Sequence, residues 1–437
     1  MRILLIGHGC APESGSEPGS TWNWAAHLAK ANDVWVITHA YFQPQIERYL
    51  AHTPIPRLRF VYTGRLGWWD PLRLPSSRWI RLHYVAWQRR VMRLAAELDA
   101  VHDFDLMHHV GWGTVSAPPR LWRLDKPFIW GPLGGGQTTP WRLLSSFGRA
   151  IPSELLRTLR VSLMPMTPAV RRAASRAAAV FSANHETTSV LRQAGAAAPR
   201  LFADVGVPRH LLQDPPPPRP KAGPFVVLWA GRIEARKGIG LCLDVARRVA
   251  APDVRFVIAG DGPLAKAAQR QAERLRLRDR VTFLGPRPWP ELQTLHRSAH
   301  VFLFTSVRDT FGNVVPEALA GGAPVICIDH QGVGAHLTAE AAMKVPVGWP
   351  AQVAAAMAHV IDNLAADRER LSEMSAAARR HAEDFAWDRR SDAMQAHYAT
   401  AIAAWRERRG RAGACMPTGH VVASSALAAG GVGAPPK

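Results

Sequence analysis

Cysteine is scarce in this sequence, with only four among 437 residues. They stand far apart, and no two of them form a C-x-x-C pair. Disulfide-rich domains and structural zinc sites both need clustered cysteines. The spacing therefore argues against both and favours a reducing compartment.

Long hydrophobic runs are also missing. No stretch approaches the roughly 18 consecutive apolar residues of a membrane-spanning helix. The first residues, MRILLIGHGC, hold one short apolar run after a single arginine, which is typical of a buried strand rather than of a signal peptide. We therefore expect a cytoplasmic protein.

Acidic residues are few relative to basic ones: 34 against 54, which gives a formal net charge of +20. Such an excess favours an anionic partner, namely nucleic acid, a phosphorylated substrate or an anionic membrane surface. The basic residues are scattered or mixed with tryptophan, and no recognised nucleic-acid-binding motif is present. We therefore expect no nucleic acid as partner, and a basic nucleic-acid-binding protein is a remote alternative.

Apolar residues are plentiful, at 47% of the chain, which is enough for two domain cores. In the first half, helical patterns alternate with the short apolar runs RILLIG, DVWVITH, LRFVYTG, DLMHHV, PFIWGP and AAVFSAN. The second half repeats the alternation with FVVLWAG, VRFVIAG, VTFLG, HVFLFTS and APVICID. This pattern predicts an α/β fold of two doubly wound, Rossmann-like parallel-sheet domains, whose strand ends face each other across a cleft.

Domain boundaries follow from composition. Four consecutive prolines make residues 214–223 a stiff linker between a first domain, 1–213, and a second domain, 224–385. Residues 408–437 are rich in glycine and alanine without periodicity, so we expect a disordered tail there.

Two loops of the second domain carry groups suited to a phosphorylated ligand. WAGRIEARKGIG places Arg232 and Lys237 beside a helix start, where charge and unpaired amides together favour a diphosphate. FVIAGDGPL places Gly260 in a turn that lets the backbone approach a ligand. Either loop alone could be an ordinary surface turn.

A third loop and the helix after it, RDTFGNVVPEALAGG, hold Asp309 and Glu317. Asp309 would lie in the loop and Glu317 about one turn into the helix, whose first turn tolerates Pro316. We expect both acids to face one pocket, with the amides near Gly312 and Asn313 pointing outward. Amides for anionic oxygens and carboxylates for hydroxyls suit a phosphorylated, polyhydroxylated ligand.

The words GRIEARKG, IAGDGPL, VTFLGPRP and DTFGNVVPEALAGGAPVI resemble the carboxyl-terminal domain of glycosyltransferase family 4, which has the GT-B fold. The words APESGSEPGSTWNWA and FIWGPLGGG resemble members that assemble polysaccharides. The resemblance implies metal-independent transfer of a sugar, with retention of configuration, from a nucleotide sugar to a glycan or polyprenyl-diphosphate-linked sugar. The nucleotide sugar is then a substrate, and no cofactor is expected. The resemblance also implies a closing helix over 386–407 that returns to the first domain.

The resemblance also assigns roles in the second domain. Arg232 and Lys237 match the pair that neutralises the donor diphosphate. Glu317 matches the second acid of the E-x7-E signature, which holds the ribose hydroxyls. Asp309 matches the first acid, which contacts the transferred sugar, although here aspartate replaces glutamate and is one methylene shorter. The loop whose backbone meets sugar and phosphate matches Phe311, Gly312 and Asn313.

In the first half, Gly19 stands where the family has a glycine near the donor phosphates. DFDLMHHVGWG ends a strand with two histidines, of which we assign His109 as the active-site histidine and keep His108 as the alternative. A structural histidine is the competing interpretation. The D-x-D word 103–105 precedes its strand, and the basic pair already supplies positive charge, so no metal is predicted.

Arginine and tryptophan are concentrated in residues 65–94 and 141–166; the first segment has seven arginines, four tryptophans and one acid. This combination suits the interface of an anionic bilayer. We expect these segments to bind the inner face of the cell membrane, although a helix with a solvated face would look similar. A nucleotide-sugar 2-epimerase of the same fold is the alternative enzyme, and it would transfer no sugar to an acceptor.

Overall fold

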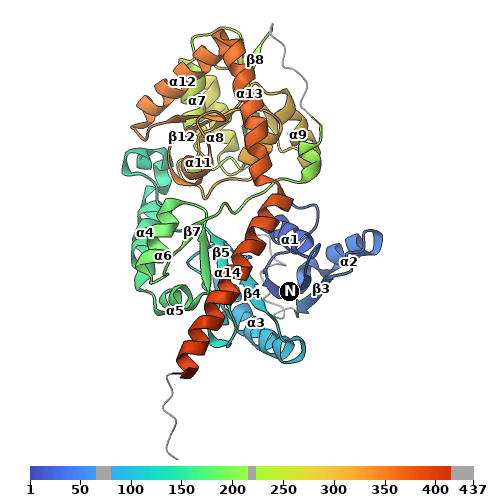
Figure 1. Ribbon diagram of the computed structural model, residues 1–437. Coiled ribbons are helices and arrows are strands. Elements are labelled where there is room, and N and C mark those ends of the chain that lie inside the picture. The colour runs from blue at the N-terminus through green and yellow to red at the C-terminus, as the bar shows by residue number, and fades with distance from the viewer. Residues whose placement is uncertain (65–79, 215–222, 415–437) are drawn as a thin grey trace, which may run out of the picture.

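The computed structural model describes residues 1–64, 80–214 and 223–414, and it contains two α/β domains stacked end to end (Figure 1). Most of the predicted linker, 215–222, and residues 65–79 of the first arginine–tryptophan segment lie outside the described residues.

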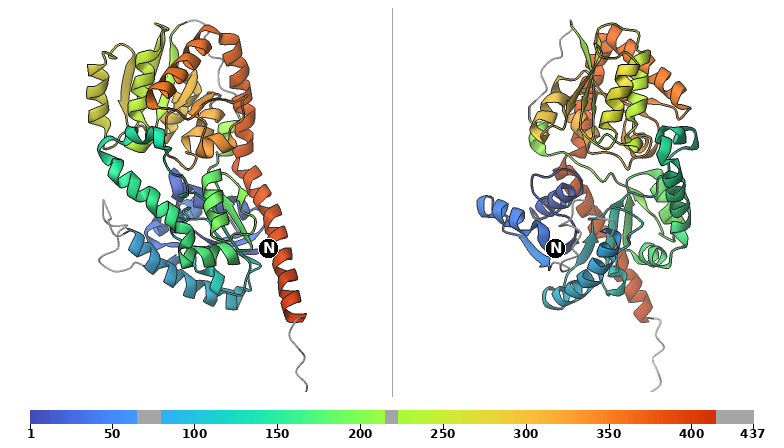
Figure 2. Two further views of the ribbon diagram at one scale, coloured as in Figure 1. Left: turned by 90° about the vertical axis from the view of Figure 1, so that its left-hand side faces the viewer. Right: turned by 180° about the vertical axis from the view of Figure 1, so that it is seen from behind.

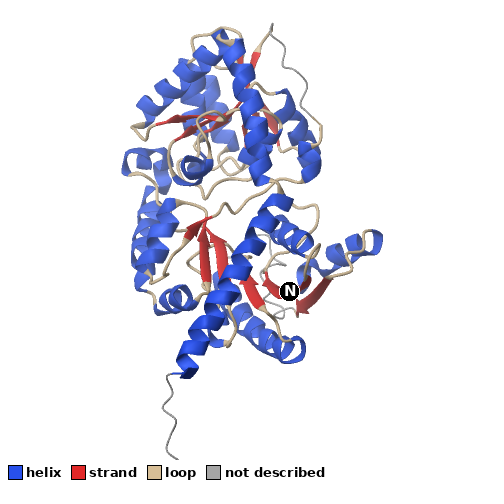
Figure 3. Cartoon of the chain, viewed as in Figure 1, coloured by secondary structure: helices blue, strands red, loops and turns tan. Residues whose placement is uncertain are grey.

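The first domain is built on a seven-stranded parallel sheet in the order β3-β2-β1-β4-β5-β6-β7. The strands are β1 (Arg2–Ile6), β2 (Asp33–His39), β3 (Leu58–Thr63), β4 (Leu106–His109), β5 (Phe128–Leu133), β6 (Ala179–Ser182) and β7 (Arg200–Leu201). The helices are α1 (Ser16–Leu28), α2 (Gln43–His52), α3 (Ile80–His102), α4 (Ile151–Leu163), α5 (Pro168–Arg176) and α6 (His185–Gln193). The central strands β1, β4 and β5 are buried almost throughout, because helices cover both faces of the sheet (Figure 3).

The second domain has a six-stranded parallel sheet in the order β10-β9-β8-β11-β12-β13. The strands are β8 (Phe225–Ala230), β9 (Val254–Ala259), β10 (Val281–Gly285), β11 (Val301–Phe304), β12 (Val325–Ile328) and β13 (Ala342–Val345). The helices are α7 (Ile239–Arg248), α8 (Ala265–Arg274), α9 (Trp289–Ser298), α10 (Val314–Ala320), α11 (Gln331–His336), α12 (Pro350–Ala366) and α13 (Arg368–Ala382).

The predicted fold class is confirmed: each apolar run named above forms a strand, and both sheets are parallel. The strand order reverses between β1 and β4 in the first sheet and between β8 and β11 in the second. In such sheets, ligands bind beyond the carboxyl ends of the strands at these reversal points. The predicted site residues lie at or after the carboxyl ends of β1, β4, β8, β9 and β11, so the fold brings them to these edges.

The chain crosses between the domains again at the start of α14 (Trp387–Ala414), which runs down along the first domain (Figures 1 and 2). There the amide of Val207 donates to the carbonyl of Phe385 at 2.8 Å, so the two crossing segments lie side by side. Met394 and Tyr398 of α14 are buried in the core of the first domain. The predicted disorder from residue 408 is wrong for 408–414, which form the last turns of α14.

A segment of the first half completes the core of the second domain. We call η4 (Trp141–Ala150), together with α4 behind it, the arm (Figure 1). Leu143 and Phe147 of η4 are buried in one hydrophobic cluster with residues of α7 and α12. These two side chains therefore cannot contact a membrane, which corrects the prediction that the whole of 141–166 forms a membrane-binding surface.

Candidate active site

An ionic cluster lies at the carboxyl edge of the second sheet. The 3-10 helix η7 (Ala235–Lys237) follows β8, and Lys237 forms an ion pair there with Asp309 from the loop after β11. Arg236 reaches the other oxygen of the same carboxylate, with Nη1 at 3.2 Å from Oδ1. Lys237 and Asp309 are both only 14% exposed, so these charges compensate one another largely away from water. Arg236, which stands beside the predicted Lys237, was not among the predicted site residues.

The electrostatics of this cluster keep Asp309 ionised. Burial disfavours the carboxylate, but the charges of Lys237 and Arg236 outweigh burial and hold the pKa of Asp309 below its usual value. The Asp309 carboxylate also accepts from its neighbour's amide, Thr310 N–H, at 3.0 Å. Asp309 is therefore an anion throughout the physiological pH range, and it can accept hydrogen bonds from hydroxyl groups.

Arg232 differs from Lys237. Its side chain is 68% exposed, and its Nε lies 3.7 Å from Oε2 of Glu234. An exposed guanidinium with such a long ion pair is free to turn toward an incoming anion. The predicted basic pair thus consists of one largely buried cation that is paired with Asp309 and one cation that is largely exposed.

Glycines allow the strand-end loops to pack closely. Gly260 has a φ of +141°, and a Cβ there would lie 1.9 Å from the carbonyl oxygen of Gly231. Gly19 has a similar constraint, because a Cβ would lie 1.7 Å from the carbonyl oxygen of Ser14. Gly312 has a φ of +102°, which other residues rarely adopt. Backbone packing is sufficient to explain Gly19 and Gly260, and their predicted ligand contacts remain predictions.

In the loop between Asp309 and α10, mainly backbone groups rather than side chains are available to a ligand. Phe311 is fully buried, and its ring stacks on Phe385 with the centroids 5.4 Å apart. Only the backbone of Phe311 is therefore available to a ligand. Asn313 precedes α10 and makes no side-chain capping hydrogen bond, so its amide group is not committed to the helix end.

Glu317 lies one turn into α10, as the sequence predicts. Its Oε1 accepts from the indole N–H of Trp289 at 3.1 Å, and its Oε2 accepts from the amide of Gln293 at 3.1 Å, both from α9. Burial raises the pKa of Glu317 to about 6, although both hydrogen bonds favour the carboxylate. Glu317 and Asp309 therefore have separate partners, and the pocket that they would share stays a prediction.

His109 ends β4 in a buried position. Its Nε2 lies 2.7 Å from the hydroxyl of Tyr84 and 2.9 Å from the amide nitrogen of Gln88, both on α3. Burial and the neighbouring His108 lower the pKa of His109 to about 3, so the imidazole is neutral at physiological pH. His108 is buried too, with Nε2 at 2.6 Å from the carbonyl oxygen of Gly131. Both histidines thus have structural partners, and the role of His109 remains a prediction.

The two domains meet at the loop that carries Asp309. Gln137, which follows β5, donates to the hydroxyl of Thr310 at 3.1 Å, and Gln331 donates to the carbonyl of Thr138 at 2.9 Å. A Cβ on Gly134 would lie 2.4 Å from the hydroxyl oxygen of Thr310. These residues could not be predicted from the sequence, because contacts across an interface leave no pattern in a single segment.

Asp204, from the first crossing segment, also belongs to this region. Burial raises the pKa of Asp204 to about 6, and the negative charge of Asp309 adds to the shift. The nearby Arg390 acts in the opposite direction. Asp204 therefore places a second carboxyl within electrostatic range of Asp309.

The D-x-D motif at residues 103–105 makes structural contacts. Asp103 precedes β4 and forms an ion pair with Lys126, with Oδ1 and Nζ 2.6 Å apart. Across residues 1–64, 80–214 and 223–414, no group of three His, Cys, Asp or Glu side chains is arranged to hold a metal ion. In the same part of the chain, no helix is long and apolar enough to cross a membrane.

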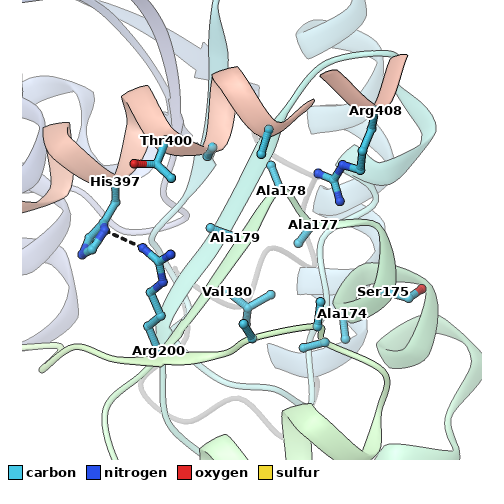
Figure 4. Close-up of a pocket in the computed structure, with 15 residues that line it drawn as sticks. Ala174, Ser175, Ala177, Ala178, Ala179, Val180, Arg200, His397, Thr400 and Arg408 are labelled. Atoms are coloured by element: carbon cyan, nitrogen blue, oxygen red, sulfur yellow. Dashed lines mark hydrogen bonds between the residues drawn. The ribbon is translucent and has the colours of Figure 1, made fainter. Parts of the chain in front are cut away.

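A hollow of about 150 Å³ lies elsewhere, between α14 and the strands β6 and β7 (Figure 4). Arg200 at its edge lies 2.9 Å from His397, from Nη1 to Nδ1. Alanines form much of its wall, and none of the predicted site residues lines it. The hollow is therefore separate from the candidate active site.

Comparison with solved structures identifies the fold as GT-B. The chain aligns with the Anabaena protein HepE, solved in complex with UDP, with a TM-score of 0.61 and 19% identity over 92% of this chain and 100% of that one. It aligns with sucrose-phosphate synthase from Thermosynechococcus elongatus with a TM-score of 0.63 and 19% identity, over 92% and 99% of the two chains.

Comparison of sequences points to the second domain. Residues 213–381 match the family of glycosyl transferases group 1. D-inositol 3-phosphate glycosyltransferases of Mycobacterium tuberculosis and Mycobacterium bovis are 35% identical over 198 residues, or 43% of this chain and 40% of theirs. The chain thus spans about two fifths of the length of these curated relatives. The family match over 213–381 contains the ionic cluster and Glu317.

The raised pKa of Glu317 predicts a dependence of stability on pH. The unfolded chain releases this proton near pH 4.5, whereas the folded protein keeps it to about pH 6, so ionisation destabilises the fold as pH rises through this window. We expect Glu317→Gln to gain stability relative to wild type between pH 4 and 7, by about 1 to 2 kcal/mol.

Urea unfolding across this pH range measures the difference. Glu291→Gln serves as the control, because Glu291 is an exposed acid on the neighbouring α9. A difference between Glu317→Gln and wild type that stays constant with pH would contradict the burial of an ionising Glu317.

Proposed function

We propose that this protein is a glycosyltransferase of family 4, which transfers a sugar from a nucleotide sugar to a glycan or lipid-linked sugar acceptor. The observation that carries the proposal is the ionic cluster of Asp309, Lys237 and Arg236 at the carboxyl edge of the second sheet. The family match over residues 213–381 supports the same activity. HepE, which has the same fold, was solved with UDP-glucose, and this supports a nucleotide-sugar donor here.

The donor diphosphate is proposed to lie between Arg232 and Lys237. Breaking the bond between sugar and phosphate builds negative charge on the leaving diphosphate. Cations placed beside this charge lower the barrier, because they stabilise the negative charge as it develops. Two side-chain cations would supply the charge that a metal ion supplies in other transferases, and we propose a reaction that needs no metal.

Sugar and ribose are proposed to bind the two acids. Asp309 is ionised and can accept hydrogen bonds from hydroxyls of the transferred sugar, beside the backbone of Gly312. Glu317 would accept from the ribose hydroxyls. The oxocarbenium-like sugar would then be attacked by the acceptor hydroxyl on the face that the diphosphate leaves, which retains the anomeric configuration.

The acceptor is proposed to bind the first domain, with His109 near the sugar. Transfer to a lipid-linked acceptor in polysaccharide, lipopolysaccharide or glycolipid assembly requires contact with a membrane. Residues 151–166 support this contact, because four leucines spaced along α4 are exposed together with Met166, which lies just after α4. The leucines are Leu155, Leu156, Leu159 and Leu163. Arg142, Arg149 and Arg160 flank them and are also exposed, which suits an anionic surface.

Removal of Lys237 tests the proposed reaction. We expect Lys237→Ala to lower kcat/KM by about 2 to 4 kcal/mol of transition-state stabilisation, which is roughly 30- to 1,000-fold. The donor is first chosen from a panel of nucleotide sugars by thermal stabilisation, because a tight ligand raises the melting temperature.

Lys266→Ala on α8 is the matched control, since Lys266 is an exposed lysine outside the site. Turnover of Lys237→Ala at the wild-type rate would overturn the assignment. Interconversion of the nucleotide sugar without transfer to another molecule would support the 2-epimerase instead.

The proposed membrane contact predicts a salt-dependent association. We expect the wild-type protein to sediment with vesicles that contain anionic phosphatidylglycerol at low salt, and Leu155→Glu with Leu159→Glu to reduce the bound fraction by about tenfold or more. Val101→Glu is the control, because Val101 is exposed on α3 outside both arginine–tryptophan segments. Equal sedimentation of the double variant and the control would count against α4 as the contact.

A further inference from the structure

A buried ion pair joins α4 of the arm to the loop that carries Asp309. Oε1 of Glu154 lies 2.8 Å from Nε of Arg308, the residue directly before Asp309. Glu154 is 3% exposed and Arg308 is 17% exposed, so the pair lies largely out of water. The pair connects the first half of the chain to the second at the edge of the candidate active site.

The burial of the Glu154 carboxylate depends on its ion pair with Arg308. Its Oε1 also accepts from the hydroxyl of Thr139 at 2.7 Å, but a hydroxyl supplies no charge. A buried carboxylate is strongly destabilising unless a cation compensates it. Arg308 supplies that cation, and its guanidinium also lies over the ring of Phe147, 5.9 Å from the centroid. Separation of the arm from the second domain would therefore leave Arg308 and Glu154 without these partners.

The same region of α4 also forms a hydrogen bond with the loop after β5, at Gln137. Arg157, about one helical turn after Glu154, donates to the carbonyl of Gln137 at 2.7 Å. Gln137 in turn donates to the hydroxyl of Thr310, at 3.1 Å. The residues on both sides of Asp309 are thus held by side chains that α4 positions, namely Arg308 by Glu154 and Thr310 by Gln137.

The backbone of Asp309 is fixed from a third direction. Its N–H donates to Oε1 of Gln331 at 2.7 Å, and Gln331 donates to the carbonyl of Thr138 at 2.9 Å. The loop that presents Asp309 to Lys237 and Arg236 is therefore anchored across the domain interface at three consecutive residues.

We propose that Glu154 and Arg308 are positioning residues, which hold the Asp309 loop in its active geometry only when the arm is seated on the second domain. They act through Asp309 and touch no substrate. This inference rests on the proposed function for its meaning in catalysis, but the positioning itself is a property of the protein alone. A variant that loosens the Asp309 loop should therefore still bind the nucleotide, because Glu317 and the basic pair hold the nucleotide end of the donor.

Hydrogen–deuterium exchange of the full-length protein tests the positioning without any substrate. We expect Glu154→Gln and Arg308→Gln each to speed exchange in peptides that cover 308–313 and 331–336 by about tenfold or more. The double variant should exchange no faster than the faster single variant, because both remove one shared interaction. Arg308→Lys keeps the charge and should restore slow exchange in part.

Arg278→Gln and Glu273→Gln form the matched control, since they break an exposed ion pair of the same domain. Their exchange in 308–313 should equal that of wild type. Wild-type exchange of 308–313 in both Glu154→Gln and Arg308→Gln would overturn the proposal, as would additive effects of the two substitutions.

Activity measurements connect the positioning to catalysis. With the nucleotide sugar chosen by thermal stabilisation, Glu154→Gln should lower kcat by about tenfold or more and leave the affinity for the free nucleoside diphosphate within about twofold of wild type. Equal loss of nucleotide affinity would indicate a general structural role and would contradict the proposal. If no nucleotide sugar is turned over by the wild-type protein, the proposed function fails, while the exchange experiment still decides whether the pair positions the loop.

Discussion

The candidate active site depends on the compensation of one buried carboxylate. Asp309 is largely out of water and nevertheless ionised, because Lys237 and Arg236 lie against its two oxygens. The cations come from the end of β8 and the anion from the end of β11, which are neighbouring strands at the reversal point of the sheet. The ion pairs therefore tie together the two loops that a diphosphate sugar would touch. Arg232 lies outside this cluster, with its side chain 68% exposed and its Nε 3.7 Å from Oε2 of Glu234.

The rest of the architecture holds this cluster against the first domain. The chain crosses between the domains in the two segments near Val207 and Ala386, which lie side by side. The arm adds a third connection, with Leu143 and Phe147 buried in the second domain and Val161 buried in the first. α4 consequently faces three environments: its first turns contact the Asp309 loop, one face packs on the first domain, and its leucines are exposed. A helix placed in this way links the proposed membrane surface to the proposed reaction centre.

Much of the fold could be predicted from the sequence because parallel strands buried on both faces are continuous apolar runs. Two strands, β7 and β13, were not predicted. Both are short and lie at the edges of their sheets, so their sequences show little of the hydrophobic pattern that predicts a strand. Residues 408–414 continue α14, although the sequence from 408 onward is rich in glycine and alanine. Leu143 and Phe147 resemble a membrane-facing segment in sequence, since burial against another domain and burial in a bilayer select the same residue types.

The site was predictable to the extent that it lies within single segments. Asp309, Lys237 and Glu317 could be named from the sequence because each follows a strand in a recognisable motif, and their roles toward a ligand remain predictions. Arg236 was missed since two adjacent cations could not be distinguished by pattern alone. Glu154, Gln137 and Gln331 were missed because each acquires its role from a partner far away in the sequence, and only folding brings those partners together.

A crystal structure of the protein with a nucleoside diphosphate sugar tests the central claim most directly. The account predicts diphosphate oxygens within hydrogen-bond distance of Lys237 and Arg232, ribose hydroxyls on Glu317 and the sugar beside Asp309. A nucleotide bound elsewhere, or a diphosphate that leaves both Lys237 and Arg232 without contact, would contradict it.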